Sequence, residues 1–263
     1  GGGGLIVGGS AVESVSPWMA RIVGTSASGA PAWELKEFFS NAGSARLHDL
    51  VPASDGTVTA LCDYKFAFGL LRVKASGQIA WKTEVPGNAA LQFRLQRAAI
   101  VQGGDLIGGG TAQATLAGPA EFAVTRLDSA GQVAWTRFIG LPFTPGAAFA
   151  NPAGVDFWGA LATAQGSRPA RVRVSFDGGL VGVFRYGDAS ALVDVAAALQ
   201  RPDGSMLLGG RRWQGQAPSA WLGVVDASGE MAWQRTWKVG LGTRLSTAGA
   251  LIALLDGDAI AVG

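Results

Sequence analysis

The sequence predicts an all-β fold built from repeated four-stranded antiparallel units. Two short motifs carry this prediction, because each recurs about every fifty residues along the 263-residue chain. A third observation is the composition, in which 40 glycines punctuate short apolar runs and charged residues make up only 15%. Glycine at this frequency, without a collagen-like period, indicates many tight turns between short strands.

The first motif is a small residue followed by Gly, with Trp four residues after the Gly. Its complete copies end at Trp33, Trp81, Trp135 and Trp233. A degenerate copy has Gly182 in place of Trp, and the five anchors are spaced by 47 to 54 residues. An indole on the last strand of a unit buries a large apolar area and needs a partner for its N–H. We therefore expect the four tryptophans to be largely buried and to dock each unit on its neighbour. The copy with Gly182 should be the weak seam unless Phe157 or Trp158 compensates.

The second motif is a turn glycine before a short apolar strand that ends in small residues. Its glycines are Gly3, Gly56, Gly103, Gly154, Gly204 and Gly257. These positions are spaced by 47 to 53 residues, which is the period of the first motif. Because two unrelated motifs give one period, a true structural repeat explains them better than chance.

Each unit resolves into four short strands, as in the stretch that begins near residue 197. The predicted strands there are residues 197–200, 206–210, 221–226 and 231–237. Asp-Gly and Ser-Gly between alternating apolar runs are strong hairpin signals, since Gly accepts the positive φ of tight turns. Four-stranded antiparallel units at this period are typical of the blades of a β-propeller.

We expect a single β-propeller domain over residues 1–263, with about five blade equivalents. The predicted blades are 1–38 (partial), 39–88, 89–142, 143–190, 191–242 and 243–263 (partial). The first supplies its last three strands and the final one its first two, so the second strand would be present twice if the ends met. This surplus favours a fragment of a larger propeller, with about six to eight blades, over a closed ring of five.

Two copies of the first motif resemble a known family pattern. Residues 128–135 read Asp-Ser-Ala-Gly-Gln-Val-Ala-Trp and residues 226–233 read Asp-Ala-Ser-Gly-Glu-Met-Ala-Trp. They resemble the tryptophan-docking motif of PQQ-like propeller repeats, although the Asp-to-Gly spacing is one residue shorter here. At the level of repeat pattern the resemblance covers essentially the whole chain. It implies the non-catalytic branch of the quinoprotein-like propeller superfamily, which includes quinoprotein dehydrogenases and non-catalytic outer-membrane assembly lipoproteins. The looser repeats of bacterial secreted propeller proteins match equally well.

The sequence predicts neither a cofactor nor a metal. Cys62 is the only cysteine and His48 the only histidine, which excludes an internal disulfide and a multi-histidine metal site. In the resembled family, a PQQ site needs a calcium ion with acidic and amide ligands, often beside a vicinal disulfide, and no matching cluster is visible. Asp256 and Asp258 are interpreted as parts of a hairpin turn, because calcium takes six or more oxygen ligands. We expect His48 at a strand end or on the surface.

The charge pattern and hydropathy exclude two further classes of partner. The formal net charge is +2, from 21 Lys and Arg against 19 Asp and Glu, and no basic run exceeds the pair Arg211–Arg212. Nucleic-acid-binding proteins carry clustered basic faces, so we expect no nucleic-acid partner. No uninterrupted apolar run approaches the length of a membrane span.

Loop lengths carry the one functional prediction. The connections between the second and third strands, and between successive units, read as long and variable, for example residues 112–119, 140–146 and 211–219. In a meander both sets emerge on the same face, and binding residues tend to lie on such loops over a rigid scaffold. Aromatic and arginine side chains are favoured at binding hot spots. The candidate binding residues are Tyr64, Arg211, Arg212 and Trp213.

The sequence thus favours a non-catalytic binding or scaffold propeller that presents this loop face to an unknown protein or glycan. We expect it to be a monomer with an extracytoplasmic location: periplasmic, surface-exposed or secreted. The alternative is an enzyme, either a hydrolase or lyase or a divergent quinoprotein, with its site in the central channel. The first strands of the units are mostly Ala, Leu and Val, which favours the binding role, because an enzyme would gather acidic or polar residues there.

Overall fold

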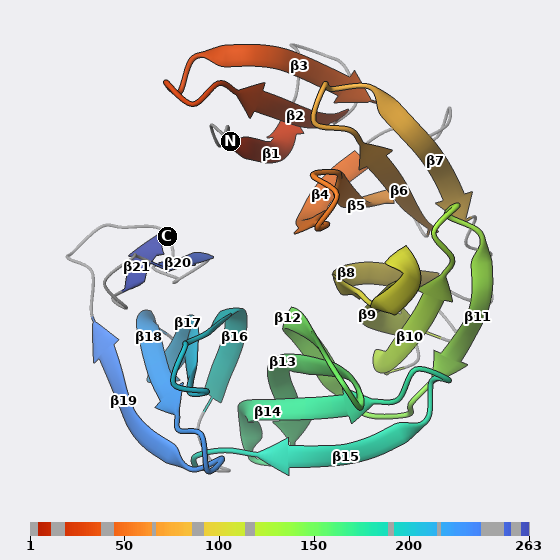
Figure 1. Ribbon diagram of the computed structural model, residues 1–263. Helices are drawn as coiled ribbons and strands as arrows, with labels where there is room; N and C mark the ends of the chain where they lie inside the picture. The colour runs from red at the N-terminus through yellow and green to blue at the C-terminus, as the bar shows by residue number, and fades with distance from the viewer. Residues whose placement is uncertain are drawn as a thin grey trace. The chain divides into compact units, whose positions relative to one another are not determined.

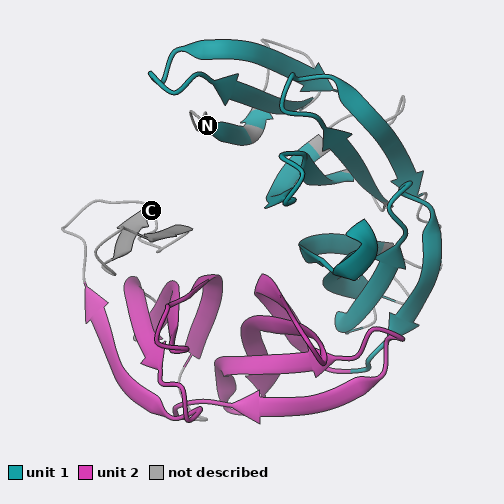
Figure 2. Cartoon of the chain, viewed as in Figure 1, with its two compact units in different colours: residues 1–140 teal, residues 141–263 magenta. Residues whose placement is uncertain are grey.

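The computed structural model describes residues 5–11, 19–37, 45–64, 67–85, 92–113, 119–188, 192–214, 217–237, 250–253 and 259–262. The chain forms two compact units, unit 1 over residues 1–140 and unit 2 over residues 141–263 (Figure 2). Within the described ranges every regular element is a strand, except one 3-10 turn, η2 (Gln102–Gly104). The all-β prediction is confirmed. The turn with Asp256 and Asp258 lies outside the described residues.

Unit 1 contains three antiparallel sheets, which we call repeats 1 to 3 (Figure 1). Repeat 1 has the strands β1 (Ile6–Ala11), β2 (Met19–Thr25) and β3 (Pro31–Glu37). Repeat 2 has β4 (Ala45–Pro52), β5 (Val58–Tyr64), β6 (Ala67–Val73) and β7 (Ile79–Val85). Repeat 3 has β8 (Gln92–Ile100), β9 (Leu106–Gln113), β10 (Glu121–Leu127) and β11 (Val133–Phe138). Each strand pairs with the next along the chain.

Unit 2 contains two more four-stranded antiparallel repeats and a final strand pair. Repeat 4 has β12 (Phe143–Asn151), β13 (Gly154–Thr163), β14 (Gly166–Val174) and β15 (Leu180–Arg185). Repeat 5 has β16 (Leu192–Gln200), β17 (Met206–Gln214), β18 (Ala217–Val225) and β19 (Met231–Trp237). The pair is β20 (Ala250–Ala253) and β21 (Ala259–Val262). Repeats 4 and 5 are joined by one parallel bridge, Ser167 to Leu192, and the Ser167 hydroxyl donates to Val193 O over 2.7 Å.

The turn between the third and fourth strands repeats the same geometry along the chain. In repeat 3, Asp128 N donates to Gln132 O and Gly131 N donates to Asp128 O, both over 2.9 Å. Gly131 has φ +83°, a left-handed conformation that glycine adopts without a steric cost. The Asp128 carboxylate accepts from Gln132 N over 2.8 Å, and the strand register shifts beside it. The Ser-Gly signal therefore encodes a hairpin turn with a glycine bulge.

The first strand of each complete repeat contains a β-bulge at the same place. The register shifts between Leu47 and Asp49, Leu95 and Arg97, Pro145 and Ala147, and Val195 and Ala197. His48 is the extra residue in β4, and its Nε2 lies 3.1 Å from Asp63 Oδ2. The expectation that His48 lies at a strand end or on the surface is wrong, because the bulge holds it half-buried within the strand.

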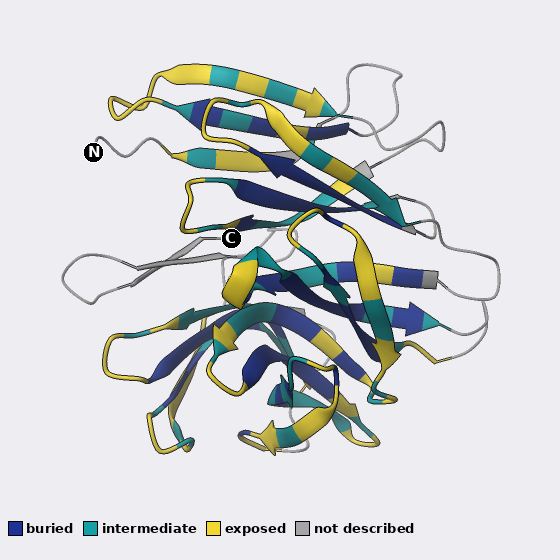
Figure 3. Ribbon diagram, turned by 45° about the vertical axis from the view of Figure 1, so that its right-hand side comes forward, coloured by how far each residue is buried: buried dark blue, intermediate teal, exposed yellow. Residues whose placement is uncertain are grey.

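The middle two strands of each complete repeat are the most buried, and the fourth strand is the most exposed (Figure 3). Buried side chains gather between successive repeats. In unit 1 one cluster joins repeats 1 and 2 around Ile22, Cys62 and Leu71, and a second joins repeats 2 and 3 around Phe68 and Leu95. In unit 2 a cluster joins repeats 4 and 5. The core of each unit is therefore a series of interfaces between sheets.

Cys62 should be inert toward thiol reagents while the protein is folded. Its side chain is fully buried, and burial raises the pKa of its thiol to about 12. Because the thiolate is the reactive form, we expect labelling by a chromogenic disulfide at pH 8 to be at least about 100-fold slower in buffer than in denaturing urea. Equal rates in the two solvents would show that the interface between repeats 1 and 2 is open.

Two of the motif tryptophans contact the turn of the following repeat. The indole N–H of Trp33 donates to Ala75 O over 2.8 Å, and a Cβ added at Gly77 would lie 2.7 Å from its ring. Trp81 donates to Ser129 O over 3.0 Å, and a Cβ added at Gly131 would lie 2.7 Å from its ring. We call this receiving surface, formed by the carbonyl and the glycine of the turn, the docking slot.

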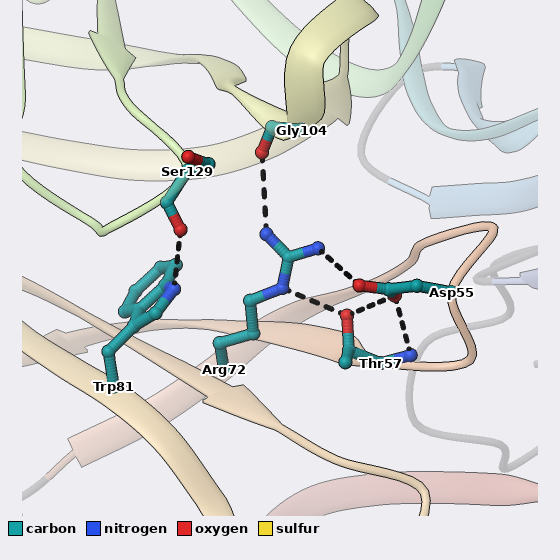
Figure 4. A network of polar contacts seen from close by, with 6 residues as sticks. All are labelled: Asp55, Thr57, Arg72, Trp81, Gly104 and Ser129. Carbon is teal, nitrogen blue, oxygen red and sulfur yellow. Dashed lines mark hydrogen bonds and ion pairs between the residues drawn. The ribbon is translucent and has the colours of Figure 1, made fainter.

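Next to Trp81, the side chain of Arg72 connects repeat 2 with repeat 3 (Figure 4). Arg72 Nε donates to the hydroxyl of Thr57 over 2.9 Å, and Arg72 Nη1 donates to Gly104 O of repeat 3 over 3.3 Å. Asp55 lies 3.4 Å from Arg72 Nη2 and accepts from Thr57 N over 2.9 Å. Repeats 2 and 3 are therefore connected at their turns by the indole of Trp81 and the guanidinium of Arg72.

The burial of the motif tryptophans is lower than expected. Trp33, Trp81 and Trp135 are half-buried, and Trp233 is 42% exposed. The docking slot of the following repeat buries one side of the Trp33 ring and of the Trp81 ring, and the other side of each ring faces solvent. The prediction that all four are largely buried is wrong, because the fourth strand, which carries each of them, is the exposed edge of its sheet.

Candidate binding site

The predicted binding residues lie at strand ends, not in a long loop. Arg211, Arg212 and Trp213 belong to β17, and the pairing with β18 continues to Gln214, opposite Ala217. The long loop expected over residues 211–219 is wrong, because ladder pairing carries both strands almost to the hairpin tip. Residues 143–146 of the stretch 140–146 likewise belong to β12. Tyr64 ends β5 in unit 1, and its side chain lies outside the described residues.

The structure brings together two of these four residues. The guanidinium of Arg211 lies 5.1 Å from the ring centroid of Trp213. The same guanidinium donates from Nη2 to Asp194 Oδ2 over 2.5 Å and from Nε over 3.2 Å. Arg212 lies between them in β17, and alternation along a strand directs it to the opposite face of the sheet. A role for these residues in partner binding stays a prediction.

A different site emerges where the motif tryptophan is missing. Gly182 lies opposite Arg173, the register position that Trp81 takes opposite Arg72. The slot on the next turn ends at Gly229, which has φ +92°. A Cβ added at Gly229 would have no atom within 4 Å, whereas one at Gly131 would touch Trp81. The docking slot of repeat 5 is therefore open.

A cavity of about 380 Å³ lies at this open slot, within unit 2. Its lining comes from the first turn of repeat 4, from the strands β13 and β14, and from both turns of repeat 5. The residues that carry the argument are Asn151, Asp156, Trp158, Arg171, Arg173 and Tyr186. Ala227 and Gly229 of the slot also line it. The cavity lies at the opposite end of β17 from Arg211, Arg212 and Trp213.

We call this cavity between repeats 4 and 5 the seam cavity. An aromatic pair forms one of its walls. The rings of Trp158 and Tyr186 stack at 5.3 Å between centroids and 13° between planes. Their exposed fractions are 3% and 5%, and both belong to the cluster that joins repeats 4 and 5. The guanidinium of Arg171 lies 5.5 Å from the Trp158 ring and 4.1 Å from the Phe184 ring. Trp158 thus supplies buried area at the seam, deeper than the slot that the missing indole leaves open.

The two acidic residues in the lining are both engaged in bonds. Asp156 accepts from Arg173 Nε over 2.6 Å and from its Nη2 over 2.8 Å. This hydrogen bond raises the pKa of Arg173 above its ordinary value. Asp226 accepts from the Ser228 hydroxyl over 2.6 Å and from Glu230 N over 3.0 Å. The bond from Ser228 is the largest cause that lowers the pKa of Asp226. Both carboxylates are therefore occupied by contacts within the fold.

Three buried donor atoms around the cavity have no hydrogen-bond partner among the described residues. They are the Tyr186 hydroxyl, Asn151 Nδ2 and Arg171 Nε. Burial raises the pKa of Tyr186, so its hydroxyl keeps its proton at neutral pH and can donate. Leaving a buried donor unsatisfied costs about 1–3 kcal/mol. Polar atoms of this kind, beside an aromatic wall, are the usual content of a small-molecule site.

The sequence contained one signal for this cavity, which is Gly182 in place of Trp. It gave no signal for Tyr186, Arg171 and Asn151, since none of them belongs to a repeated motif. Within the described ranges, no three His, Cys, Asp or Glu side chains gather in a way that could hold a metal ion. The described part of the chain also contains no helix long and apolar enough to cross a bilayer.

No family model matches the chain, and no curated protein matches it. Solved structures do. A mutant of Synechocystis apocarotenoid oxygenase is 13% identical, with a TM-score of 0.56 over 92% of this chain and 60% of that one. Drosophila Plexin A in complex with Semaphorin 1b is 9% identical, with a TM-score of 0.53 over 86% and 54%. The Dos1 propeller is 13% identical, with a TM-score of 0.50 over 85% and 56%.

This chain has a β-propeller-like fold. At such low identities the likeness concerns the fold alone. The chain spans between a half and two thirds of the length of these three solved chains.

Proposed function

We propose that the chain is a non-catalytic binding module, in which the repeats act as a scaffold and the seam cavity of unit 2 holds a small organic ligand. The observation that carries this proposal is the open docking slot beside three unmatched buried donors. A volume of about 380 Å³ falls within the range of about 300–1,000 Å³ in which proteins bind small molecules.

The chemistry of the cavity favours binding over acid–base catalysis. A general acid or base must be free to exchange a proton with the substrate. Asp156 has both carboxylate oxygens bonded to one guanidinium, and Asp226 organises the turn of repeat 5. The alternative proposal is an enzyme, a hydrolase or lyase or a divergent quinoprotein, with its site in the central channel, and the described residues lend it no comparable geometric support.

The wider context of the module is also a proposal. Docking of Trp33 and Trp81 on the next turn supports a relation to PQQ-like propeller repeats, as the tryptophan motif suggests. We also propose a protein or glycan partner at the strand ends near Arg211 and Trp213, and an extracytoplasmic location for the scaffold. The half-buried cation–π pair at 5.1 Å supports such a contact, because Arg and Trp are enriched at hot spots.

Filling the slot from within should abolish ligand binding. In Gly182→Trp the new indole would lie where Trp81 lies in repeat 2, and its Cβ would approach Phe184 at 3.2 Å, a half-exposed ring that can shift. We expect the variant to be more stable by about 1–2 kcal/mol. It should also lose binding of small ring compounds, tested with a panel of indole, phenol, benzoate and glucose by ligand-observed NMR.

Val181→Trp is the matched control, because it adds the same side chain at the adjacent, 56% exposed position on the other face of β15. It should bind the panel as the parent protein does. The proposal fails if no panel compound binds the parent, or if Gly182→Trp binds them equally well.

A further inference from the structure

The open slot has the same local structure as the slots that receive an indole. In repeat 5, Asp226 N donates to Glu230 O over 2.9 Å and Gly229 N donates to Asp226 O over 3.0 Å. The corresponding bonds in repeat 3 are both 2.9 Å. Ala227 occupies the position of Ala75 and Ser129, whose carbonyls accept the indole N–H. The slot thus offers a glycine face for a flat ring and a carbonyl for a ring N–H.

The donors on the other side of the cavity call for a different chemical group. Tyr186 O–H, Asn151 Nδ2 and Arg171 Nε are all buried and unmatched, and all three residues line the cavity. A ligand group that satisfies only donors must be rich in acceptors, and a carboxylate accepts several bonds at once. Guanidinium–carboxylate bonds are also among the strongest hydrogen bonds in proteins.

Of the two arginines in the cavity lining, as far as the structure describes it, only one can pair with a ligand carboxylate. Arg173 is engaged by both oxygens of Asp156. Arg171 Nη1 lies 3.9 Å from Asp156 Oδ2, too far for a hydrogen bond. Arg171 is therefore the cation that a buried ligand carboxylate would need for pairing. Its guanidinium lies 4.1 Å from the Phe184 ring and 5.5 Å from the Trp158 ring.

We propose that the seam cavity takes a planar aromatic carboxylate whose ring carries an N–H donor, bound with the ring in the open docking slot and the carboxylate on Arg171 and Tyr186. The proposal rests on the binding role given above and names its ligand class. Indole-3-acetate is the simplest probe, since it joins the missing indole to a carboxylate.

Titration calorimetry with four compounds tests each part of the ligand. Indole-3-acetate should bind at least about 10-fold more tightly than indole, which lacks the carboxylate. It should bind about 3- to 10-fold more tightly than naphthalene-1-acetate, which lacks the N–H. Acetate alone should show no binding, because it cannot fill the slot. Gly182→Trp should bind none of them.

Two variants test the assigned side chains. Tyr186→Phe keeps the ring stacked on Trp158 and removes the hydroxyl, so it should weaken indole-3-acetate about 3- to 10-fold and leave indole unchanged. Arg171→Gln should weaken indole-3-acetate by at least about 10-fold. The control is Arg185→Gln, an exposed arginine of β15 outside the cavity lining, which should leave both affinities unchanged.

The outcomes separate the two proposals. If indole binds the parent but not Gly182→Trp, and the carboxylate adds less than about 2-fold, the ligand class is wrong and the binding role stands. The ligand class is also wrong if Tyr186→Phe and Arg171→Gln weaken indole as much as indole-3-acetate. If neither compound nor any ring compound of the panel binds the parent, both proposals fall.

Discussion

Gly110→Ala is expected to destabilise unit 1 by about 4 kcal/mol or more, or to prevent its folding. A Cβ added at Gly110 would lie 1.8 Å from Arg94 O and 2.7 Å from Arg94 C. These are backbone atoms of β8, which pairs with β9 at Leu95 and Gly110. The added methyl can be accommodated only if the two strands separate, because a main-chain carbonyl in a sheet cannot rotate away. Urea unfolding followed by circular dichroism measures the loss.

Gly108→Ala is the matched control in the same strand. There the new Cβ would lie 2.6 Å from Leu95 Cδ1, the end of a side chain that can adopt another rotamer. We expect a cost of about 1 kcal/mol. Equal losses at positions 108 and 110 would contradict the close approach of β8 and β9. A Cβ added at Gly210 in repeat 5 would likewise lie 1.8 Å from Asp194 O, so repeats 3 and 5 share this constraint.

Gly131→Ala should cost about 3 kcal/mol, and Gly229→Ala about 1 kcal/mol. The two glycines have similar φ, +83° and +92°, so both substitutions carry the same left-handed backbone cost. Only at Gly131 would the new Cβ also meet neighbours, the Trp81 ring and Thr83 Oγ1, both at 2.7 Å. The difference between the stability losses of the two variants therefore measures the energetic cost of displacing the indole from the occupied slot, since the slot of repeat 5 is open.

Differential scanning calorimetry of the parent and both variants gives this comparison. Gly29→Ala offers a second reference, because Gly29 has φ +83° and no atom near its added Cβ. It should resemble Gly229→Ala. If all three variants lose the same stability, the contact of Trp81 with the turn contributes nothing, and the docking slot is not an energetic feature.

Much of the fold could be predicted from the sequence, because turn chemistry is local. In repeat 5, Gly204 lies in the turn before β17 and Gly229 in the turn before β19, and each of the four predicted strands overlaps one of β16 to β19. Strand lengths were less predictable. Residues 197–200 were expected as the first strand, but β16 begins at Leu192. The bulge between Val195 and Ala197 adds one residue and reverses the alternation, so the apolar pattern breaks in the middle of a continuous strand.

The site could be predicted only in part. Gly182 replaces the motif tryptophan, and this single substitution predicted a weak contact between repeats 4 and 5. Tyr186, Arg171 and Asn151 come together through the packing of two sheets, and no local pattern encodes that. The pair Arg211 and Trp213 was predicted from residue type alone. The structure explains Arg211 equally well as the partner of Asp194.

The docking slot has a consequence for how new binding sites could arise in such an array. The docking slots of repeats 2 and 3 each receive an indole that belongs to the preceding repeat. Loss of one side chain, as at Gly182, converts an intramolecular contact into a vacancy without altering the turn that forms it. Duplication of repeats would therefore multiply such slots, and a single codon change at a docking tryptophan would open one of them while the other copies keep their contacts.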